Sequence, residues 1–228
     1  MRILLVGHGR MGRLIEGLAP EYECEVAGVI DSHSAGRGEE GWGRVDVAVD
    51  FSAPAAVAAN APVLARRGIS LVVGTTGWQA DEASVRDAVA QAGVGIVAAP
   101  NFSTGAVILE AVVAQAARLF ARQAEFGAWI HEAHHAAKKD APSGTALALA
   151  SAMAQAGFTR RIDVASTRAG HMPGTHTVGF DGASESIALT HAARDRTTFA
   201  RGALLAARWV HGRHGWFTMK DVLGLPGE

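Results

Sequence analysis

The first hundred residues alternate short apolar runs with longer alanine-rich amphipathic stretches, separated by turns marked with glycine or serine. The runs show no polar–apolar alternation, which is typical of strands covered on both faces of a parallel sheet. Such strands are predicted at residues 3–6, 26–30, 45–51, 71–73 and 94–99. Ser52 and Asp81 are expected to cap two of the intervening helices. Strands alternating with helices predict an α/β fold with a doubly wound parallel sheet.

After Pro100 the pattern changes to longer helical stretches mixed with alternating segments. Helices are predicted at 105–122, 145–155 and 199–210, and strands at 125–130 and 185–191. We therefore expect a domain over 1–103 followed by an α+β domain over 104–202 with an open mixed or antiparallel sheet. An open sheet needs its second face covered, and a homo-oligomer is one way to cover it.

Charge is nearly balanced in these 228 residues, with 21 Lys and Arg against 22 Asp and Glu. Such a chain lacks the basic surface that binds nucleic acid or anionic lipid. Its one cysteine, Cys24, rules out an internal disulfide and fits a reducing compartment. The first apolar run is too short for a signal peptide, and no stretch reaches the ~18 apolar residues of a membrane span. We expect a cytoplasmic protein with no nucleic-acid or membrane partner.

The run Gly7-His8-Gly9-Arg10-Met11-Gly12 fits the pattern G-x-G-x-x-G, and it follows a predicted strand and begins a predicted helix. In this context the first two glycines allow a tight turn and close approach to a pyrophosphate, which the N–H groups of the helix N-terminus attract. Asp31 ends the second predicted strand, where the ribose hydroxyls of a dinucleotide lie. The first domain is therefore predicted to be of the Rossmann type; a glycine-rich turn with no ligand is the alternative.

Asp31 favours NADH over NADPH, because a carboxylate accepts two hydroxyl hydrogen bonds and repels a 2′-phosphate. Ser32, His33 and Arg37 could still receive that phosphate, so NADH and NADPH both stay open.

Two more turns follow predicted strands at the sheet edge where ligands bind in such folds. They are Gly74-Thr75-Thr76-Gly77 and Pro100-Asn101-Phe102-Ser103. Either could be a plain loop, but together they are expected to contact the nicotinamide ribose and amide.

The densest polar cluster runs from His131 to Thr145. Its first residues match the zinc-protease pattern H-E-x-x-H, with histidines at 131 and 135. That pattern needs both histidines on one helix, whereas here a strand-like run precedes it. His171, His176 and His191 are possible further ligands, but a zinc hydrolase remains the lesser hypothesis.

The cluster fits better as an anion site that contains a proton donor. Ser143-Gly144-Thr145 begins a predicted helix, so its hydroxyls and N–H groups can hold a carboxylate. Lys138 adds positive charge, and the adjacent His134 and His135 titrate near neutral pH. A solvated, histidine-rich loop without a ligand is the alternative.

This cluster resembles the signature of the dihydrodipicolinate reductases, now called 4-hydroxy-tetrahydrodipicolinate reductases, of lysine biosynthesis. The residues that carry the resemblance are Glu132, His134, His135, Lys138, Asp140, Pro142, Ser143, Gly144, Thr145 and Ala146. The likeness extends through 74–77, 99–102 and 195–199, so it covers nearly the whole chain.

The resemblance implies a role for each matching residue. His134 matches the family's proton donor and Lys138 its catalytic lysine, and Arg196 matches an arginine near a substrate carboxylate. The positions that hold the substrate correspond to His135, Gly144 and Thr145. Cofactor contacts correspond to Gly7, His8, Gly9, Arg10, Met11, Gly12, Asp31, Gly74, Thr75, Thr76, Ala99, Pro100, Asn101 and Phe102. No metal is implied.

The resemblance also implies a first domain completed by the C-terminal segment, 203–228, and a homotetramer formed through the sheets of the second domain. The sequence departs from the family pattern at its first turn, which is one residue shorter than the usual G-x-x-G-R-M-G. It is also short between residues 31 and 45 and between 155 and 164. These changes affect the cofactor preference and the oligomer interface more than the chemistry. A nucleotide sensor or scaffold without catalysis is a further alternative.

Overall fold

The computed structural model describes residues 1–31 and 42–225. The chain forms two compact units, one made of Met1–Ser103 and Thr197–Glu228 and the other of Thr104–Arg196. The expected boundary at residue 203 falls inside one helix, α6 (Thr197–Val210), and this helix belongs as a whole to the first unit. None of the helices within the described ranges has the length and apolarity needed to cross a bilayer.

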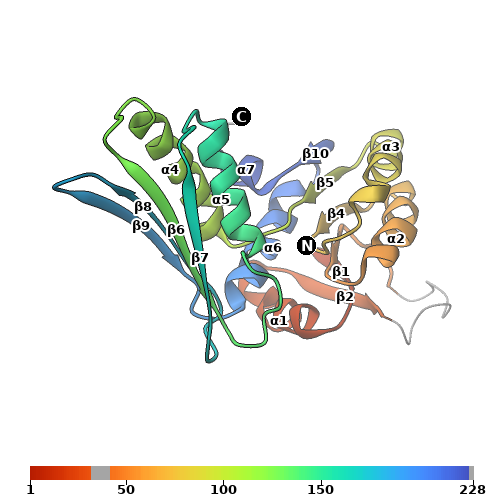
Figure 1. The fold of residues 1–228 in the computed structure, drawn as a ribbon. Helices are drawn as coiled ribbons and strands as arrows, with labels where there is room; N and C mark the ends of the chain where they lie inside the picture. Colours follow the sequence, from red (N-terminus) through yellow and green to blue (C-terminus); the bar gives the residue numbers. More distant parts are fainter. Residues whose placement is uncertain (32–41, 226–228) are drawn as a thin grey trace. The chain divides into compact units, whose positions relative to one another are not determined.

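The first unit contains a parallel six-stranded sheet in the order β10-β5-β4-β3-β1-β2 (Figure 1). The strands are β1 (Arg2–Val6), β2 (Glu25–Ile30), β3 (Val47–Asp50), β4 (Ser70–Val73), β5 (Gly95–Ala98) and β10 (Gly215–Phe217). The five strands expected from the apolar runs are present, and the three-residue β10 is an addition. The order reverses between β1 and β3, which is where doubly wound sheets bind ligands.

Helices cover both faces of this sheet, which explains the unbroken apolar runs. They are α1 (Arg10–Leu18), η1 (Ala19–Tyr22), α2 (Pro54–Arg66), η2 (Gln79–Asp81), α3 (Glu82–Ala92), α6 and α7 (Met219–Val222). Leu4 and Val6 of β1 share one core cluster with Val57 of α2 and Val85 of α3. Side chains alternate along a strand, so the buried Leu5 faces the opposite side, where α6 contacts β3, β4 and β5.

The second unit has a mixed sheet in the order β7-β6-β8-β9, in which only the pair β6–β7 is parallel. Its strands are β6 (Gly127–His134), β7 (Ile162–Arg168), β8 (Thr175–Asp181) and β9 (Ser186–Ala192), and its helices are α4 (Thr104–Phe120) and α5 (Gly144–Gln155). The helices pack on one face, with a core that includes Val113, Ile130, Leu149 and Phe180 (Figure 1). Strand β6 runs through His134, four residues beyond the expected end.

Candidate active site

The turn between β1 and α1 has the geometry that a dinucleotide requires. Gly7 has φ +93°, and a Cβ there would lie 2.5 Å from the Phe51 carbonyl oxygen. A Cβ on Gly12 would clash with the Gly7 carbonyl oxygen, whereas one on Gly9 would meet nothing within 4 Å. The first turn of α1 carries no acidic residue, and no side chain caps its N–H groups. The turn therefore has room and donors for a pyrophosphate.

Several of the predicted cofactor residues use their side chains in contacts with other residues of the protein. The Thr75 hydroxyl donates a hydrogen bond to Asp50 (2.7 Å), and Phe102 is 2% exposed and packs edge-on against Phe51. Thr75 and Phe102 can therefore contact a ligand only through their backbone groups. The Asn101 carboxamide accepts a hydrogen bond from the Ser103 N–H (2.8 Å), and His8 Nε2 lies 2.8 Å from the Glu16 carboxylate.

The sequence analysis overlooked Asp50, which is buried at the C-terminal end of β3. Its carboxylate accepts hydrogen bonds from the Ser52 hydroxyl (2.6 Å), the Ser52 N–H (3.0 Å) and Thr75. These hydrogen bonds lower the pKa of Asp50, but burial has the larger effect, so the pKa is raised overall. Ser52 therefore does not cap α2 as expected; Ala53 occupies the N-cap position and Pro54 the first turn. The polar pattern Asp-x-Ser at a strand end was the available signal.

Asp31 directly follows β2, as expected for a residue near the ribose hydroxyls. The Ser32, His33 and Arg37 positions that could receive a 2′-phosphate lie outside the described residues.

In the second unit, the end of β6 places Glu132 and His134 on the helix-covered face. Glu132 is 0% exposed, and its Oε2 lies 2.5 Å from Nδ1 of His134. Arg168, at the end of β7, donates to both carboxylate oxygens, at 2.9 and 2.6 Å. Burial raises the pKa of Glu132, but hydrogen bonds from Arg168, Ser166 and His134 outweigh it and lower the pKa to about 2. Glu132 is therefore ionised at neutral pH.

The other ring nitrogen of His134, Nε2, faces Gly174 in the loop before β8. A Cβ on Gly174 would lie 2.9 Å from Nε2, and the φ of +149° favours glycine at this position. Burial lowers the pKa of His134, and the charges of Lys138 and Arg168 lower it further, against the raising effect of Glu132.

Ser143 joins this group through its backbone and its hydroxyl. Its N–H donates to Glu132 Oε1 (3.3 Å), and its hydroxyl caps α5 by accepting from the Ala146 N–H (3.2 Å). The hydroxyl also lies 3.0 Å from Nε2 of His176, a buried residue of β8. Since Ser143 is 2% exposed, the exposed Gly144 and half-buried Thr145 are the residues that present the helix N-terminus to a ligand.

Lys138 and His135 lie in the turn that follows β6. The Lys138 ammonium pairs with the Asp140 carboxylate at 2.8 Å, and this hydrogen bond lowers the pKa of Asp140. The His135 N–H donates to the Met172 carbonyl oxygen (2.8 Å). Arg196 lies exposed in the turn after β9, and its place beside a substrate stays a prediction.

The sequence could not reveal Arg168 or the position of His176. Arg168 lies 36 residues after Glu132, and only the parallel pairing of β6 and β7 brings it opposite His134. His176 pairs with Glu132 across β6 and β8. A buried carboxylate needs a cationic partner, so an arginine or lysine near Glu132 could be expected. The sequence has many arginines, however, and does not tell which of them is the partner.

The zinc-protease reading of His131 and His135 finds no support, because this segment is a strand and not a helix. His131 faces the opposite side of the sheet and contacts the Thr167 hydroxyl at 3.0 Å. Glu132, His134 and His176 do bring potential ligand atoms within 4.8 Å of one another. These atoms are already occupied, however: Glu132 by Arg168, His134 Nδ1 by Glu132 and His176 Nε2 by Ser143. The cluster is a hydrogen-bonded network with its own internal cation.

Comparison with known proteins matches both parts of the chain to one family. The profile described as dihydrodipicolinate reductase, N-terminus, matches residues 1–102, and the one described as its C-terminus matches residues 105–223. A 4-hydroxy-tetrahydrodipicolinate reductase of Rhodopseudomonas palustris is 38% identical, with 99% of this chain and 98% of the relative covered. One of Methanosarcina barkeri is 36% identical, with 95% and 96% covered.

Solved structures share the fold. Dipicolinate-bound dihydrodipicolinate reductase from Paenisporosarcina sp. TG-14 superposes with a TM-score of 0.82 at 21% identity, covering 97% of this chain and 98% of that chain. An amine dehydrogenase from Mycobacterium smegmatis gives a TM-score of 0.60 at 11% identity, covering 100% and 96%.

Proposed function

The chain belongs to the dihydrodipicolinate reductase family, and we propose that it reduces 4-hydroxy-tetrahydrodipicolinate, via dihydrodipicolinate, to tetrahydrodipicolinate in diaminopimelate and lysine biosynthesis. The observation that carries the proposal is His134, a buried imidazole held at Nδ1 by Glu132. An oriented imidazole close to a lysine and a helix N-terminus is suited to protonating a bound dicarboxylate. A nucleotide sensor or scaffold has no need of such an arrangement.

Gly7, Gly9 and Gly12 would hold the pyrophosphate of the cofactor, with backbone groups of 74–76 and 99–102 near its nicotinamide end. When bound, NAD(P)H supplies the hydride that reduces the conjugated imine of the substrate. Asp31 would bind the ribose hydroxyls and favour NADH. Replacing Asp31 with Asn removes the charge that repels a 2′-phosphate, so the KM for NADPH should fall relative to that for NADH. An unchanged ratio would contradict this preference.

His134 would protonate the ring carbon next to the one that is reduced. Lys138, His135 and Thr145 would hold the carboxylates, together with Arg196 and the N–H groups at Gly144. The Lys138 ammonium would then exchange its Asp140 partner for a substrate carboxylate. Bound carboxylates favour the protonated form of His134, which offsets the lowering of its pKa by burial.

A coupled assay tests the reaction itself. Pyruvate and aspartate semialdehyde are supplied with the upstream synthase, and the loss of NADH or NADPH absorbance is followed separately. Turnover above the synthase-only background is the expected result. If no turnover occurs with either cofactor although NADH binds, the chain is a sensor or scaffold.

The role of His134 is tested by His134→Ala, which should lower turnover by roughly 10²–10⁴-fold because proton delivery is lost. The matched control is His214→Ala, which removes an exposed histidine of the first unit. Full turnover in a folded His134→Ala protein would refute the assignment.

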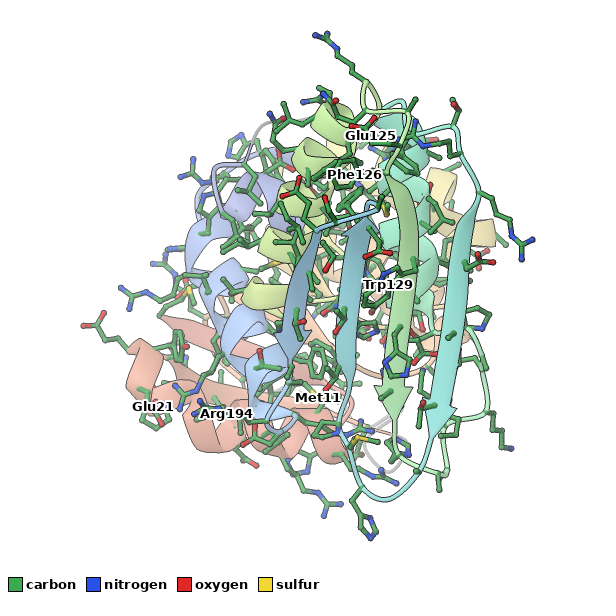
Figure 2. The ribbon with its side chains drawn as sticks, turned by 60° about the vertical axis from the view of Figure 1, so that its left-hand side comes forward. Met11, Glu21, Glu125, Phe126, Trp129 and Arg194 are labelled. Carbon is green, nitrogen blue, oxygen red and sulfur yellow. The ribbon has the colours of Figure 1, made fainter. Side chains whose placement is uncertain are left out.

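We also propose that the chain assembles as a homotetramer in the cytoplasm through the helix-free face of its second sheet. Trp129 projects from this face of β6, at 37% exposure (Figure 2). Side-chain alternation places His131, Thr175 and Thr177 on the same face, where Asp181 at the end of β8 is the one acidic or basic residue, histidine aside, that the central strands β6 and β8 offer. A face this low in charge suits contact with a second copy.

A further inference from the structure

Glu132 is the most deeply buried charged residue of the second unit, and so far it has been described only as the acceptor that holds His134. It is fully buried, and besides the contact with His134 on its own strand it accepts hydrogen bonds from neighbouring elements. Both terminal nitrogens of the Arg168 guanidinium, on β7, donate hydrogen bonds to the Glu132 carboxylate. The Ser143 N–H, at the start of α5, donates another at 3.3 Å. Burying a carboxylate is costly unless it is paired in this way. Stability alone does not explain this buried ion pair, because a well-packed apolar pair is often as stable or more stable.

The position of this ion pair determines the state of His134. Because Glu132 is an ionised acceptor, the His134 Nδ1 that lies 2.5 Å from it must carry a proton. In neutral His134 the lone pair is then on Nε2, the nitrogen that faces Gly174. Proton exchange with a substrate is confined to Nε2 in a fixed ring orientation.

Arg168 fixes Glu132 in turn. Its guanidinium also donates to the Asp140 and Thr167 carbonyl oxygens, at 2.6 and 2.8 Å, which anchors it to two segments. A bidentate guanidinium–carboxylate contact constrains both planes, so the carboxylate cannot rotate away from the imidazole.

We propose that Glu132 and Arg168 are positioning residues for proton transfer: Glu132 fixes the tautomer and orientation of His134, and Arg168 fixes Glu132. This inference rests on the proposed role of His134 as the proton donor. The three residues form a chain of contacts, Arg168–Glu132–His134, that crosses from β7 to β6.

The charged and titratable groups around His134 give the two substitutions opposite electrostatic effects. Glu132 and Arg168 flank the ring, Lys138 follows on the turn after β6, and the His176 ring lies on β8 with its centroid 5.1 Å away. His191 of β9 and Glu132 in turn act on His176. Removing the negative charge of Glu132 disfavours the imidazolium, whereas removing the positive charge of Arg168 favours it.

The experiment compares Glu132→Gln with Arg168→Gln. In Glu132→Gln the amide can donate to Nδ1 and so stabilise the wrong tautomer, and kcat should fall by roughly 10²-fold or more. The limb of the kcat/KM profile that reports His134 should move about one pH unit or more to the acid side. In Arg168→Gln the same limb should move to the alkaline side, with a smaller loss of kcat. Glu132→Asp should restore part of the rate, and Glu185→Gln, at an exposed site of the same unit, should leave the profile unchanged.

The His134 titration is also followed directly by NMR in ¹³C-histidine-labelled protein. Opposite pKa shifts in the two Gln variants support the proposal, and equal shifts or no shift overturn it. If Glu132→Gln does not fold, Arg168→Gln and Glu132→Asp still decide by the direction of the shift. If His134→Ala keeps full turnover, the proposed role of His134 as proton donor fails, whereas the NMR titration still tests the positioning contacts.

Discussion

Gly174 is a single residue on which access to His134 depends. The ring of His134 cannot turn aside freely, because Glu132 holds its other nitrogen. Any side chain at position 174 would therefore meet Nε2 at 2.9 Å, and it would also be strained by the φ of +149°. The glycine serves two purposes at once: it adopts the positive φ with which the loop enters β8, and it leaves space beside Nε2 that a side chain would fill.

Replacing Gly174 with Ala should lower kcat by roughly 10-fold or more, because the methyl group displaces or covers Nε2. Gly170→Ala is the matched control, since Gly170 has φ +55° but a methyl group there would meet nothing within 4 Å. Both variants lose on the order of 1–3 kcal/mol of stability from backbone strain. Rates are compared per folded protein, measured by circular dichroism; equal rates in the two variants would contradict the argument.

At the level of elements, the sequence predicted those that its local pattern specifies. Strands β1 to β5 are unbroken apolar runs and were expected where they lie. Strand β10 has three residues, too few for a periodic signal, and no helix or strand was predicted after residue 210. The mixed character of the second sheet depends on β7, which pairs in parallel with β6 across the intervening α5. Pairing of this kind is a tertiary property that one strand's sequence does not encode.

The candidate site follows the same division. His134, Lys138 and Ser143 could be predicted as candidates because they lie within one contiguous segment. Arg168, Asp50 and the contact of His176 with Ser143 were not, because each depends on which strands are neighbours. Phe102 was expected at the cofactor, yet its side chain packs in the core, since sequence alone does not tell a backbone contact from a side-chain contact.

The glycines at the start of helix α1 and within it are expected to differ in their effect on cofactor binding and on stability, and substitutions can test this directly. Gly9→Ala puts a methyl group into open space at the anion site, so the Kd for NADH should rise roughly tenfold or more with little loss of stability. Gly12→Ala drives a methyl group against the Gly7 carbonyl oxygen and should cost about 1–3 kcal/mol of stability. Gly17→Ala, with nothing within 4 Å, should stabilise the helix by about 0.5–1 kcal/mol and leave the Kd unchanged. Fluorescence titration and chemical denaturation measure the two quantities, and a Kd unaffected by Gly9→Ala would argue against a pyrophosphate at this turn.

For the whole molecule, the buried histidine of β8 makes stability depend on pH. Burial, with the nearby charge of His134, lowers the pKa of His176 to about 4 from an ordinary 6.5. The unfolded chain binds this proton more readily, so the stabilising contribution is fully present above pH 6.5 and is lost as the pH falls through 4. The loss is on the order of 3 kcal/mol. Glu132, with its pKa lowered to about 2 from 4.5, loses its contribution only at lower pH.

Replacing His176 with Gln should therefore flatten the fall in unfolding free energy between about pH 6.5 and 4. The slope does not vanish, because burial also lowers the pKa values of His134 and His191. Urea denaturation at several pH values measures the effect. A variant with the same slope as the parent protein would show that His176 is not the group responsible.

Trp129 is the side chain whose replacement best tests the proposed contact between copies of the chain. Trp129 lies flat on Gly179 of β8, where any Cβ would clash with the indole, so the pair makes a smooth apolar centre on the helix-free face of the sheet. In a symmetric assembly each substitution at such a centre is repeated in every copy. Trp129→Glu should therefore place like charges opposite one another and shift the protein toward the monomer in light scattering, while Trp129→Phe should keep the assembly. The fold of the monomer should survive, because Trp129 is already 37% exposed and its removal leaves no buried cavity. A folded Trp129→Glu protein with the parent's molar mass would place the contact between copies on another surface.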